Sequence, residues 1–140
     1  ISLNRETILG HKADKTVGDC PKIPEHVILA IRAKFVPACV KECCELGVKG
    51  LVILSAGFKE MGPPGIALEE EILKHIKKAG TRLVGPIVLG VMTPNFGLND
   101  TFAACMGNQG PMCFLSQSGA MCTAKLDWAE LTGLGFSAFV

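Results

Sequence analysis

The chain has 140 residues, 49% of them hydrophobic, which is enough for a domain with a buried core. Its 14 basic residues against 13 acidic ones leave a formal net charge of +1, so a strongly basic nucleic-acid surface is excluded. No apolar run approaches the roughly 20 residues that span a bilayer, and we expect a cytoplasmic protein. The start at Ile1 rather than Met, and the strand-like close at Phe139 and Val140, predict a piece of a longer protein.

The first half of the chain reads as two strand–helix units. Residues 1–26 are loop-rich, with Ile1–Leu3 as a possible strand end. The continuous apolar run Val27–Ile31 predicts a strand covered on both faces. A helix follows over Phe35–Gly47, with a proline in its first turn and a glycine at its end. Val48–Leu54 is the second predicted strand.

A long charged helix follows. Gly62–Gly65 reads as a rigid turn, Glu69–Glu71 as the acidic first turn of the helix, and Gly80 as its stop. Its predicted buried face is Ile72, Leu73 and Ile76. A short strand over Arg82–Val84 comes next.

The segment after this strand allows more than one prediction. Ile87–Val91 either extends the strand or turns along the sheet edge, and residues 93–111 read as a linker rich in Pro, Gly and Asn. Met112–Leu115 then predicts a short buried strand, and Phe136–Val140 a last one. The intervening helix ends at Gly133, with a predicted buried stripe of Met121, Ala124, Trp128 and Leu131.

The turn between that short strand and the last helix is Ser116, Gln117, Ser118 and Gly119. The first N–H groups of a helix have no internal partner and carry partial positive charge, so the turn suits a phosphoryl group or a carboxylate. The two serines add hydroxyl groups, and the glycine allows close approach to the backbone. The alternative is an ordinary helix start with Ser118 as N-cap, because such sequences are common there.

Strands alternating with helices predict an α/β fold with a doubly wound parallel sheet and right-handed crossovers. Ligands bind beyond the carboxyl ends of such strands. We expect the post-strand loops to share one edge: Arg32–Lys34, Ser55–Gly57, Gly85–Pro86 and Ser116–Gly119. The absence of G-x-G-x-x-G disfavours a nicotinamide-dependent enzyme.

The seven cysteines predict free thiols, because an odd number in an α/β pattern argues against a disulfide framework. They are Cys20, Cys39, Cys43, Cys44, Cys105, Cys113 and Cys122. Cys39 and Cys43 share a helix face, so a partial metal site is an alternative to packing as small hydrophobes. No C-x2-C spacing accompanies them, and we expect no metal site.

Twelve short segments carry a resemblance to a known family, in order along nearly the whole chain. They are Ile8–Gly10, Ala33–Pro37, Gly47–Gly50, Ile53–Glu60, Glu69–Glu71, Gly85–Pro86, Leu89–Val91, Gly97–Asn99, Thr101–Ala103, Phe114–Ala120, Leu126–Ala129 and Gly135–Ser137. Together they resemble the α region of ADP-forming acyl-CoA synthetases (acetate–CoA ligase, ADP-forming), which are relatives of succinyl-CoA synthetase.

The resemblance implies two domains. Residues 1–109 would be a Rossmann-like CoA-binding domain without its N-terminal part, and 110–140 the first β-α-β of a flavodoxin-like ligase domain. The implied reaction interconverts acyl-CoA, ADP and phosphate with acid, CoA and ATP, through an acyl phosphate and a phosphohistidine. That histidine is expected beyond Val140, so no catalytic residue is assigned here, not even His11, His26 or His75.

The resemblance also implies ligands and partners. The turn Ser116–Gly119 would receive the phosphoryl group. Seven residues would face CoA: Ala33, Lys34, Ser55, Ala56, Gly57, Gly85 and Pro86. ADP or ATP with Mg²⁺ would bind on an ATP-grasp β part, fused or separate, with a small carboxylic acid as co-substrate. A homo- or hetero-oligomer is expected, with no nucleic-acid or membrane partner.

The chain departs from the family at two places. The family has Gly-Pro-Asn-Cys where this chain reads Gly85, Pro86, Ile87 and Val88, so two side chains near the reacting thioester become aliphatic. Arg32 stands where a proline is expected. An alternative is therefore a non-catalytic CoA-binding regulatory region, like the synthetase-like domains of some protein lysine acetyltransferases.

Overall fold

The structure is a computed structural model that describes residues 1–2 and 4–140. The chain forms two compact units, and each is described by itself. Unit 1 comprises Ile1–Val27, Ile31–Leu51 and Gly57–Leu83; unit 2 comprises Ile28–Ala30, Val52–Ala56 and Val84–Val140. The possible strand end at Ile1–Leu3 includes Leu3, which lies outside the described residues. Across the described ranges, no helix is both long and apolar enough to cross a bilayer.

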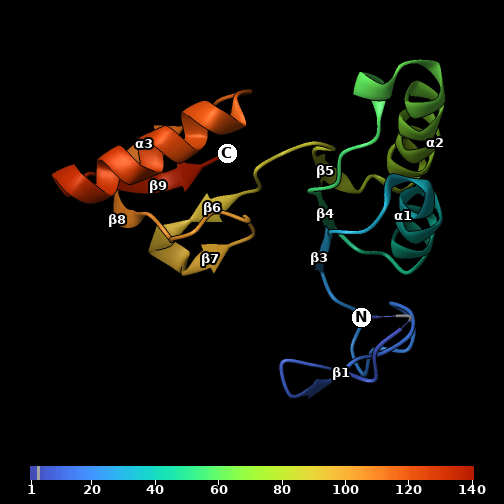
Figure 1. The fold of residues 1–140 in the computed structure, drawn as a ribbon. Coiled ribbons are helices and arrows are strands. Elements are labelled where there is room, and N and C mark those ends of the chain that lie inside the picture. The colour runs from blue at the N-terminus through green and yellow to red at the C-terminus, as the bar shows by residue number, and fades with distance from the viewer. Residues whose placement is uncertain (3) are drawn as a thin grey trace. The chain divides into compact units, whose positions relative to one another are not determined.

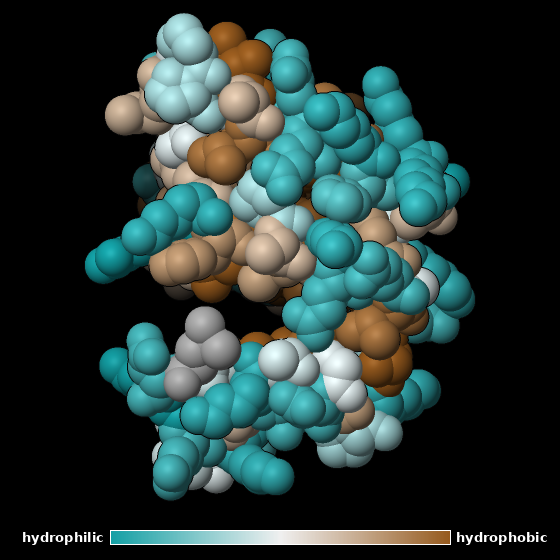
Figure 2. All heavy atoms as spheres, turned by 90° about the vertical axis from the view of Figure 1, so that its right-hand side faces the viewer, coloured by the Kyte–Doolittle hydropathy of each residue, from teal (hydrophilic) through white to brown (hydrophobic). Residues whose placement is uncertain are grey.

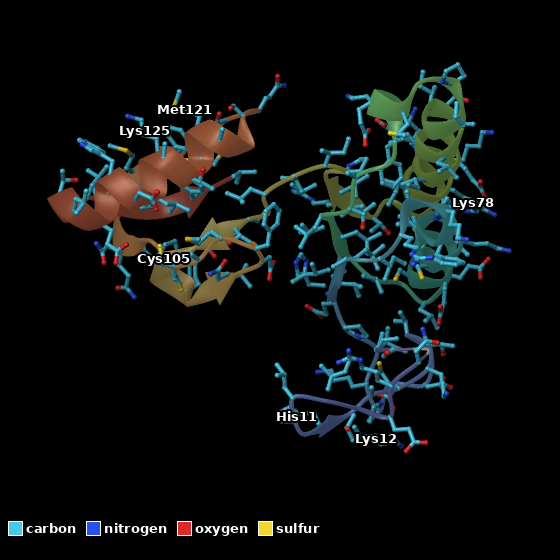
Figure 3. All side chains as sticks on the ribbon, in the orientation of Figure 1. His11, Lys12, Lys78, Cys105, Met121 and Lys125 are labelled. Carbon is cyan, nitrogen blue, oxygen red and sulfur yellow. The ribbon has the colours of Figure 1, made fainter. Side chains whose placement is uncertain are left out.

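The N-terminal segment of unit 1 contains a small antiparallel hairpin. Strand β1 (Thr7–Ile8) pairs with β2 (His11–Lys12), with Ile8 opposite His11. The hairpin turns at Leu9 and Gly10, both of which have positive φ. Figure 3 labels His11 and Lys12 on this hairpin.

A three-stranded parallel sheet is formed by β3 (His26–Leu29), β4 (Gly50–Ile53) and β5 (Arg82–Val84), in the order β3-β4-β5. The central strand is completely buried over its last three residues, Leu51, Val52 and Ile53. This confirms the predicted strands at β4 and β5, and with them the α/β class. The prediction that β3 is covered on both faces is wrong, because Ile28 on this edge strand is 41% exposed.

Helix α1 (Val36–Glu45) follows a single 3-10 turn, η1 (Ala33–Phe35). Pro37 lies in the first turn of α1, where its missing N–H leaves no hydrogen bond unmade. Gly47 follows the helix with φ of +80° and donates to the carbonyl of Cys44, which is how a glycine ends a helix. Both ends of α1 thus confirm the prediction.

Helix α2 (Pro63–Ala79) follows a second 3-10 turn, η2 (Lys59–Met61), and begins earlier than predicted. The predicted turn Gly62–Gly65 is wrong: Gly62 is the N-cap, and Pro63 opens the helix, where proline is preorganised. The glutamates Glu69–Glu71 therefore lie in mid-helix rather than in the first turn.

The buried face of α2 consists of Gly65, Ile72 and Ile76, whereas Leu73, predicted to be buried, is 37% exposed. Helices α1 and α2 lie side by side (Figure 1). Their outer face is mostly hydrophilic, with smaller hydrophobic patches (Figure 2). Lys78 projects from this face into solvent (Figure 3).

Unit 2 contains a four-stranded mixed sheet in the order β7-β6-β9-β8. Strand β6 (Met92–Thr93), turn η3 (Pro94–Phe96) and β7 (Leu98–Asn99) form an antiparallel hairpin. The prediction of a linker over residues 93–111 is therefore wrong. Strand β8 (Asn108–Phe114) runs parallel to β9 (Gly135–Phe139), and helix α3 (Gly119–Thr132) connects them. This confirms the predicted strand–helix–strand unit.

The core of unit 2 lies between α3 and the sheet. It consists of Leu89, Met92, Cys122, Leu126, Ala129, Phe136 and Phe139. The Phe139 ring stacks on Phe114 at 5.1 Å and meets Phe136 edge-on at 5.0 Å. The buried stripe of α3 is thus Cys122, Leu126 and Ala129.

Two predictions about burial in unit 2 are wrong. The predicted stripe of α3 faces outward, with Trp128 49% and Leu131 87% exposed. Met121 and Lys125 project from α3 away from β8 and β9 (Figure 3). Strand β8 is not buried either: it is an edge strand with Met112 42% exposed.

Candidate functional site

The loops that follow β3, β4 and β5 all extend from strands of one parallel sheet. They carry the candidate residues Ala33, Lys34, Ser55, Ala56, Gly57, Gly85 and Pro86. The turn Ser116–Gly119 follows β8, which belongs to the other sheet. The expectation that all four loops share one sheet edge is therefore wrong for this fourth loop.

In unit 1, Gly57 and Ala33 are in contact. Gly57 has φ of +110°, and a Cβ built on it would lie 2.8 Å from the Cβ of Ala33. A side chain at this position would be strained by the backbone and would clash with its neighbour, so only glycine fits. Next to Ala33, the Lys34 ammonium lies 4.8 Å from the centroid of the Phe35 ring.

The Gly57 backbone is also held by Glu60. Its carboxylate accepts hydrogen bonds from the N–H of Gly57 and, at 3.0 Å, from the N–H of Phe58. Desolvation opposes the charged form of Glu60, but these N–H groups outweigh it and hold the pKa of the carboxyl below its usual value. Sequence reasoning missed this residue; its signal was a carboxylate three residues after a glycine in a turn.

In unit 2, the loop after β5 contacts the end of β4 and forms a hydrogen bond with the loop after β4. Gly85 has φ of +94°, and a Cβ there would lie 2.4 Å from the carbonyl oxygen of Ile53. The Gly85–Pro86 peptide bond is cis. Ile87 donates its backbone N–H to the carbonyl of Ser55 at 3.2 Å. Residues 87–91 do not extend β5, which ends at Val84.

Ile87 is held in an unusual conformation. Its φ is +59°, in the left-handed region that β-branched residues rarely adopt, and its side chain is 44% exposed. Such strain persists where the surrounding structure enforces it, and it concentrates at functional sites. The Gly85–Ile87 turn therefore holds Ile87 in a conformation that costs local stability.

In the turn before α3, Ser118 is the N-cap, as the alternative reading of the sequence had it. Its Oγ accepts from the N–H of Met121 at 3.3 Å, and the Oγ of Ser116 accepts from the N–H of Ser118 at 3.1 Å. Burial raises the pKa of the Cys122 thiol, and a hydrogen bond from the Ser116 hydroxyl opposes this rise. Ser116 is thus occupied within the protein, between Ser118 and Cys122.

Capping leaves part of this turn open. Among the described residues, none accepts from the N–H groups of Gly119 or Ala120, and Gln117 is exposed. A Cβ on Gly119 would meet no heavy atom within 4 Å, and its φ is ordinary. The protein itself therefore gives no reason for a glycine here, whereas an anion approaching the helix N-terminus would.

The remaining candidates are the cysteines and a metal site. All seven cysteines are free, and Cys43, with no exposed surface, has its pKa raised to about 12 by burial. No group of three or more His, Cys, Asp or Glu side chains in residues 1–2 and 4–140 is placed to hold a metal ion.

A comparison with protein families identifies the family of the chain. The model for the CoA binding domain matches residues 1–94. The chain belongs to the CoA-binding-domain family. The matched stretch includes the loops after β3, β4 and β5, whereas Ser116–Gly119 lie beyond it.

The chain has ADP-forming ligases among its relatives. It is 45% identical to acetate–CoA ligase (ADP-forming) I of Archaeoglobus fulgidus, over 85% of this chain and 18% of the relative. It is 36% identical to the α subunit of acetate–CoA ligase (ADP-forming) I of Pyrococcus furiosus, over 92% of this chain and 28% of the subunit. The chain thus spans less than a third of the relatives' lengths. The resemblance to the α region of these ligases is confirmed.

A solved structure supports the same assignment. The dinucleotide-forming acetyl-coenzyme A synthetase 1 of Ca. Korarchaeum cryptofilum, in complex with phosphate and ADP, superposes with a TM-score of 0.91 at 29% identity. The superposition covers 100% of this chain and 30% of that one. The chain therefore has the fold of part of this acetyl-coenzyme A synthetase.

Proposed function

We propose that this chain is part of the α region of an ADP-forming acyl-CoA synthetase, and that it binds coenzyme A and a phosphoryl group. The observation that carries the proposal is the family match over residues 1–94, which covers three loops at the carboxyl ends of one parallel sheet. Ligands of such sheets bind beyond those strand ends. The boundary between the two proposed domains stays at residues 109 and 110.

CoA enters this proposal as a substrate. The residues proposed to contact CoA are Ala33, Lys34, Ser55, Ala56, Gly57, Gly85 and Pro86. Two glycines with positive φ allow the backbone to lie close to its neighbours, so peptide groups rather than side chains line these loops. Backbone N–H and C=O groups suit the amides of the pantetheine chain, and Lys34 suits the CoA phosphates.

The phosphoryl group would bind at Ser116, Gln117, Ser118 and Gly119. The N–H groups of Gly119 and Ala120 and the helix dipole favour an anion. The hydroxyl of Ser118 accepts from Met121 and keeps its proton to donate to a phosphate oxygen. Ser116 supports the turn, since its hydroxyl is engaged by Ser118 and Cys122.

The parent protein would supply the other parts of the reaction. We assign the phosphorylated histidine, ADP or ATP with Mg²⁺, and the small-acid site to parts other than these 140 residues, including an ATP-grasp β part, fused or separate. The parent would be a cytoplasmic oligomer that interconverts acyl-CoA, ADP and phosphate with acid, CoA and ATP.

A second candidate is a CoA-binding regulatory region without chemistry. Ile87 favours it, because an exposed aliphatic side chain at the β5 loop offers no polar group to a reacting thioester. The gene around this segment separates the two functions. A phosphorylatable histidine and an ATP-grasp domain support the ligase, and an acetyltransferase domain supports regulation.

Isothermal titration with CoA tests the first half of the proposal. We expect saturable binding of CoA and none of NAD. The isolated chain should show no acid- and CoA-dependent ATP hydrolysis, and robust turnover would refute the assignment of the histidine to another part of the parent.

The variant Gly119→Ala tests the second half. An alanine here meets open space and favours helix, so thermal stability should hold or rise, while phosphate affinity should fall because the methyl group blocks close approach. Unchanged phosphate affinity would remove the turn from the site.

A further inference from the structure

Glu60 makes an unusual set of contacts for an exposed glutamate. Its two carboxylate oxygens bind the N–H groups of two successive residues, Gly57 and Phe58. Phe58 is fully buried, and its carbonyl accepts from the N–H of Met61 at 2.8 Å. The side chain therefore joins the turn η2 to the end of the loop that follows β4.

The backbone of Gly57, to which Glu60 is bound, has a conformation that requires support from its surroundings. Gly57 has φ of +110° and lies against the Cβ of Ala33. A glycine is free to leave such a conformation, because it populates both signs of φ at little cost. Fixing its N–H by a carboxylate removes that freedom, since charge-assisted hydrogen bonds are about twice as strong as neutral ones.

The negative charge of Glu60 is unfavourable close to a site for CoA, so its presence there needs a physical explanation. CoA is an anion, so a carboxylate beside its binding surface lowers affinity by repulsion unless it contributes something that outweighs this effect. Two N–H donors stabilise the charged carboxylate, as the lowered pKa reflects. The contribution available to Glu60 is the position of the Gly57 backbone.

We propose that Glu60 is a positioning residue for coenzyme A, which fixes the Gly57 backbone beside Ala33 and so holds the surface that receives the pantetheine chain. This inference rests on the proposed function. Glu60 itself need not touch CoA, and nothing in the family match assigns it a role.

The test compares three variants by isothermal titration. Glu60→Ala removes both acceptors, Glu60→Gln keeps one, and Glu71→Ala is the control, because Glu71 is an exposed glutamate of α2 and its removal changes the net charge equally. Each is titrated with CoA and with adenosine 3′,5′-bisphosphate, the nucleotide half of CoA without pantetheine.

We expect Glu60→Ala to weaken CoA binding about tenfold, the loss typical of a broken charge-assisted pair of hydrogen bonds. Glu60→Gln should recover part of the affinity, and Glu71→Ala should stay within about twofold of wild type. Affinity for the bisphosphate should not change in any of them. A role through charge alone predicts the opposite sign, because removing an anion would tighten CoA binding.

Amide hydrogen exchange gives a readout that needs no ligand. The N–H groups of Gly57 and Phe58 should be protected in wild type and should exchange faster in Glu60→Ala, with the core of β4 unchanged. Unchanged exchange, unchanged or tighter CoA binding, or an equal loss for both ligands would each overturn the inference. If the wild-type chain does not bind CoA, the proposed function fails and the inference fails with it.

Discussion

The hydroxyl oxygen of Ser118 accepts a hydrogen bond from the backbone N–H of Met121 at 3.3 Å, so the residue that caps α3 also stands at the proposed phosphate turn. Capping uses an acceptor lone pair, whereas phosphate binding uses the hydroxyl proton. The two roles are therefore compatible in one serine, and substitutions can separate them.

The variant Ser118→Asp should keep the N-cap of α3 and lose the ability to bind phosphate. Aspartate caps helices as well as serine does, so the free energy of unfolding should change by less than about 0.5 kcal/mol. Its negative charge should repel phosphate and abolish binding in a titration. Ser118→Ala is the control: it should cost about 1 kcal/mol through the lost cap, yet keep part of the phosphate affinity through the helix N–H groups. Phosphate affinity unaltered in Ser118→Asp would contradict the site.

Gly65→Ala should destabilise unit 1 severely. A Cβ at this position would lie 1.7 Å from the carbonyl oxygen of Phe58, so α2 could not pack where it does. We expect a loss of about 3 kcal/mol or failure to fold, measured by urea denaturation. Gly119→Ala is the matched control, because that glycine also lies in the first turn of a helix but faces open space. Similar stabilities for the two variants would be inconsistent with the close packing of α2 on Phe58.

Ile87→Asn should stabilise the chain by about 1 kcal/mol, because asparagine tolerates the left-handed conformation that costs other residues about 1–2 kcal/mol. Asparagine is also the residue that the resemblance to the synthetase family implies at this position. Ile66→Asn is the control: Ile66 is also 44% exposed, but it lies in α2 with helical backbone. Thermal melts should show a gain for Ile87→Asn and none for Ile66→Asn. Equal changes would indicate that strain at Ile87 is absent.

Because of the Cys43 thiol, the free energy of unfolding should decrease in alkaline solution. Burial raises the pKa of its thiol from 9.0 to about 12, so between these values the unfolded chain loses a proton that the folded chain keeps. The stability from this group is complete below pH 9 and is lost as pH rises toward 12. Urea titrations across this range should show a steeper decline for wild type than for Cys43→Ala. Parallel slopes would show that the thiol ionises as readily in the folded chain.

The sequence predicted the elements whose hydrophobic pattern is unambiguous. Leu51–Ile53 is a continuous apolar run and forms the central strand, while Val36, Val40 and Cys43 recur at helical spacing and form the buried face of α1. The hairpin of β6 and β7 was missed because each strand has two residues, too few to show any period.

The face of α3 was misjudged because the helix has two apolar stripes. Cys122, Leu126 and Ala129 form one, and Met121, Trp128 and Leu131 the other. Periodicity alone fits both, and only the phenylalanines of β9 decide which is buried. The site was predicted where glycines mark close backbone approach, at Gly57 and Gly85. Glu60 was not predicted as a site residue, because its role depends on local hydrogen bonds that no pattern of hydrophobicity reveals.

The place of β9 in its sheet has a consequence for biosynthesis. Strand β9 lies between β6 and β8, which do not pair with each other, and it is made after both of them. While the ribosome is adding residues 92–134, these two segments therefore lack the partner that joins them. Strands β6 and β8 are joined only when Gly135–Phe139 emerges from the exit tunnel, so their incorporation into one sheet waits for β9.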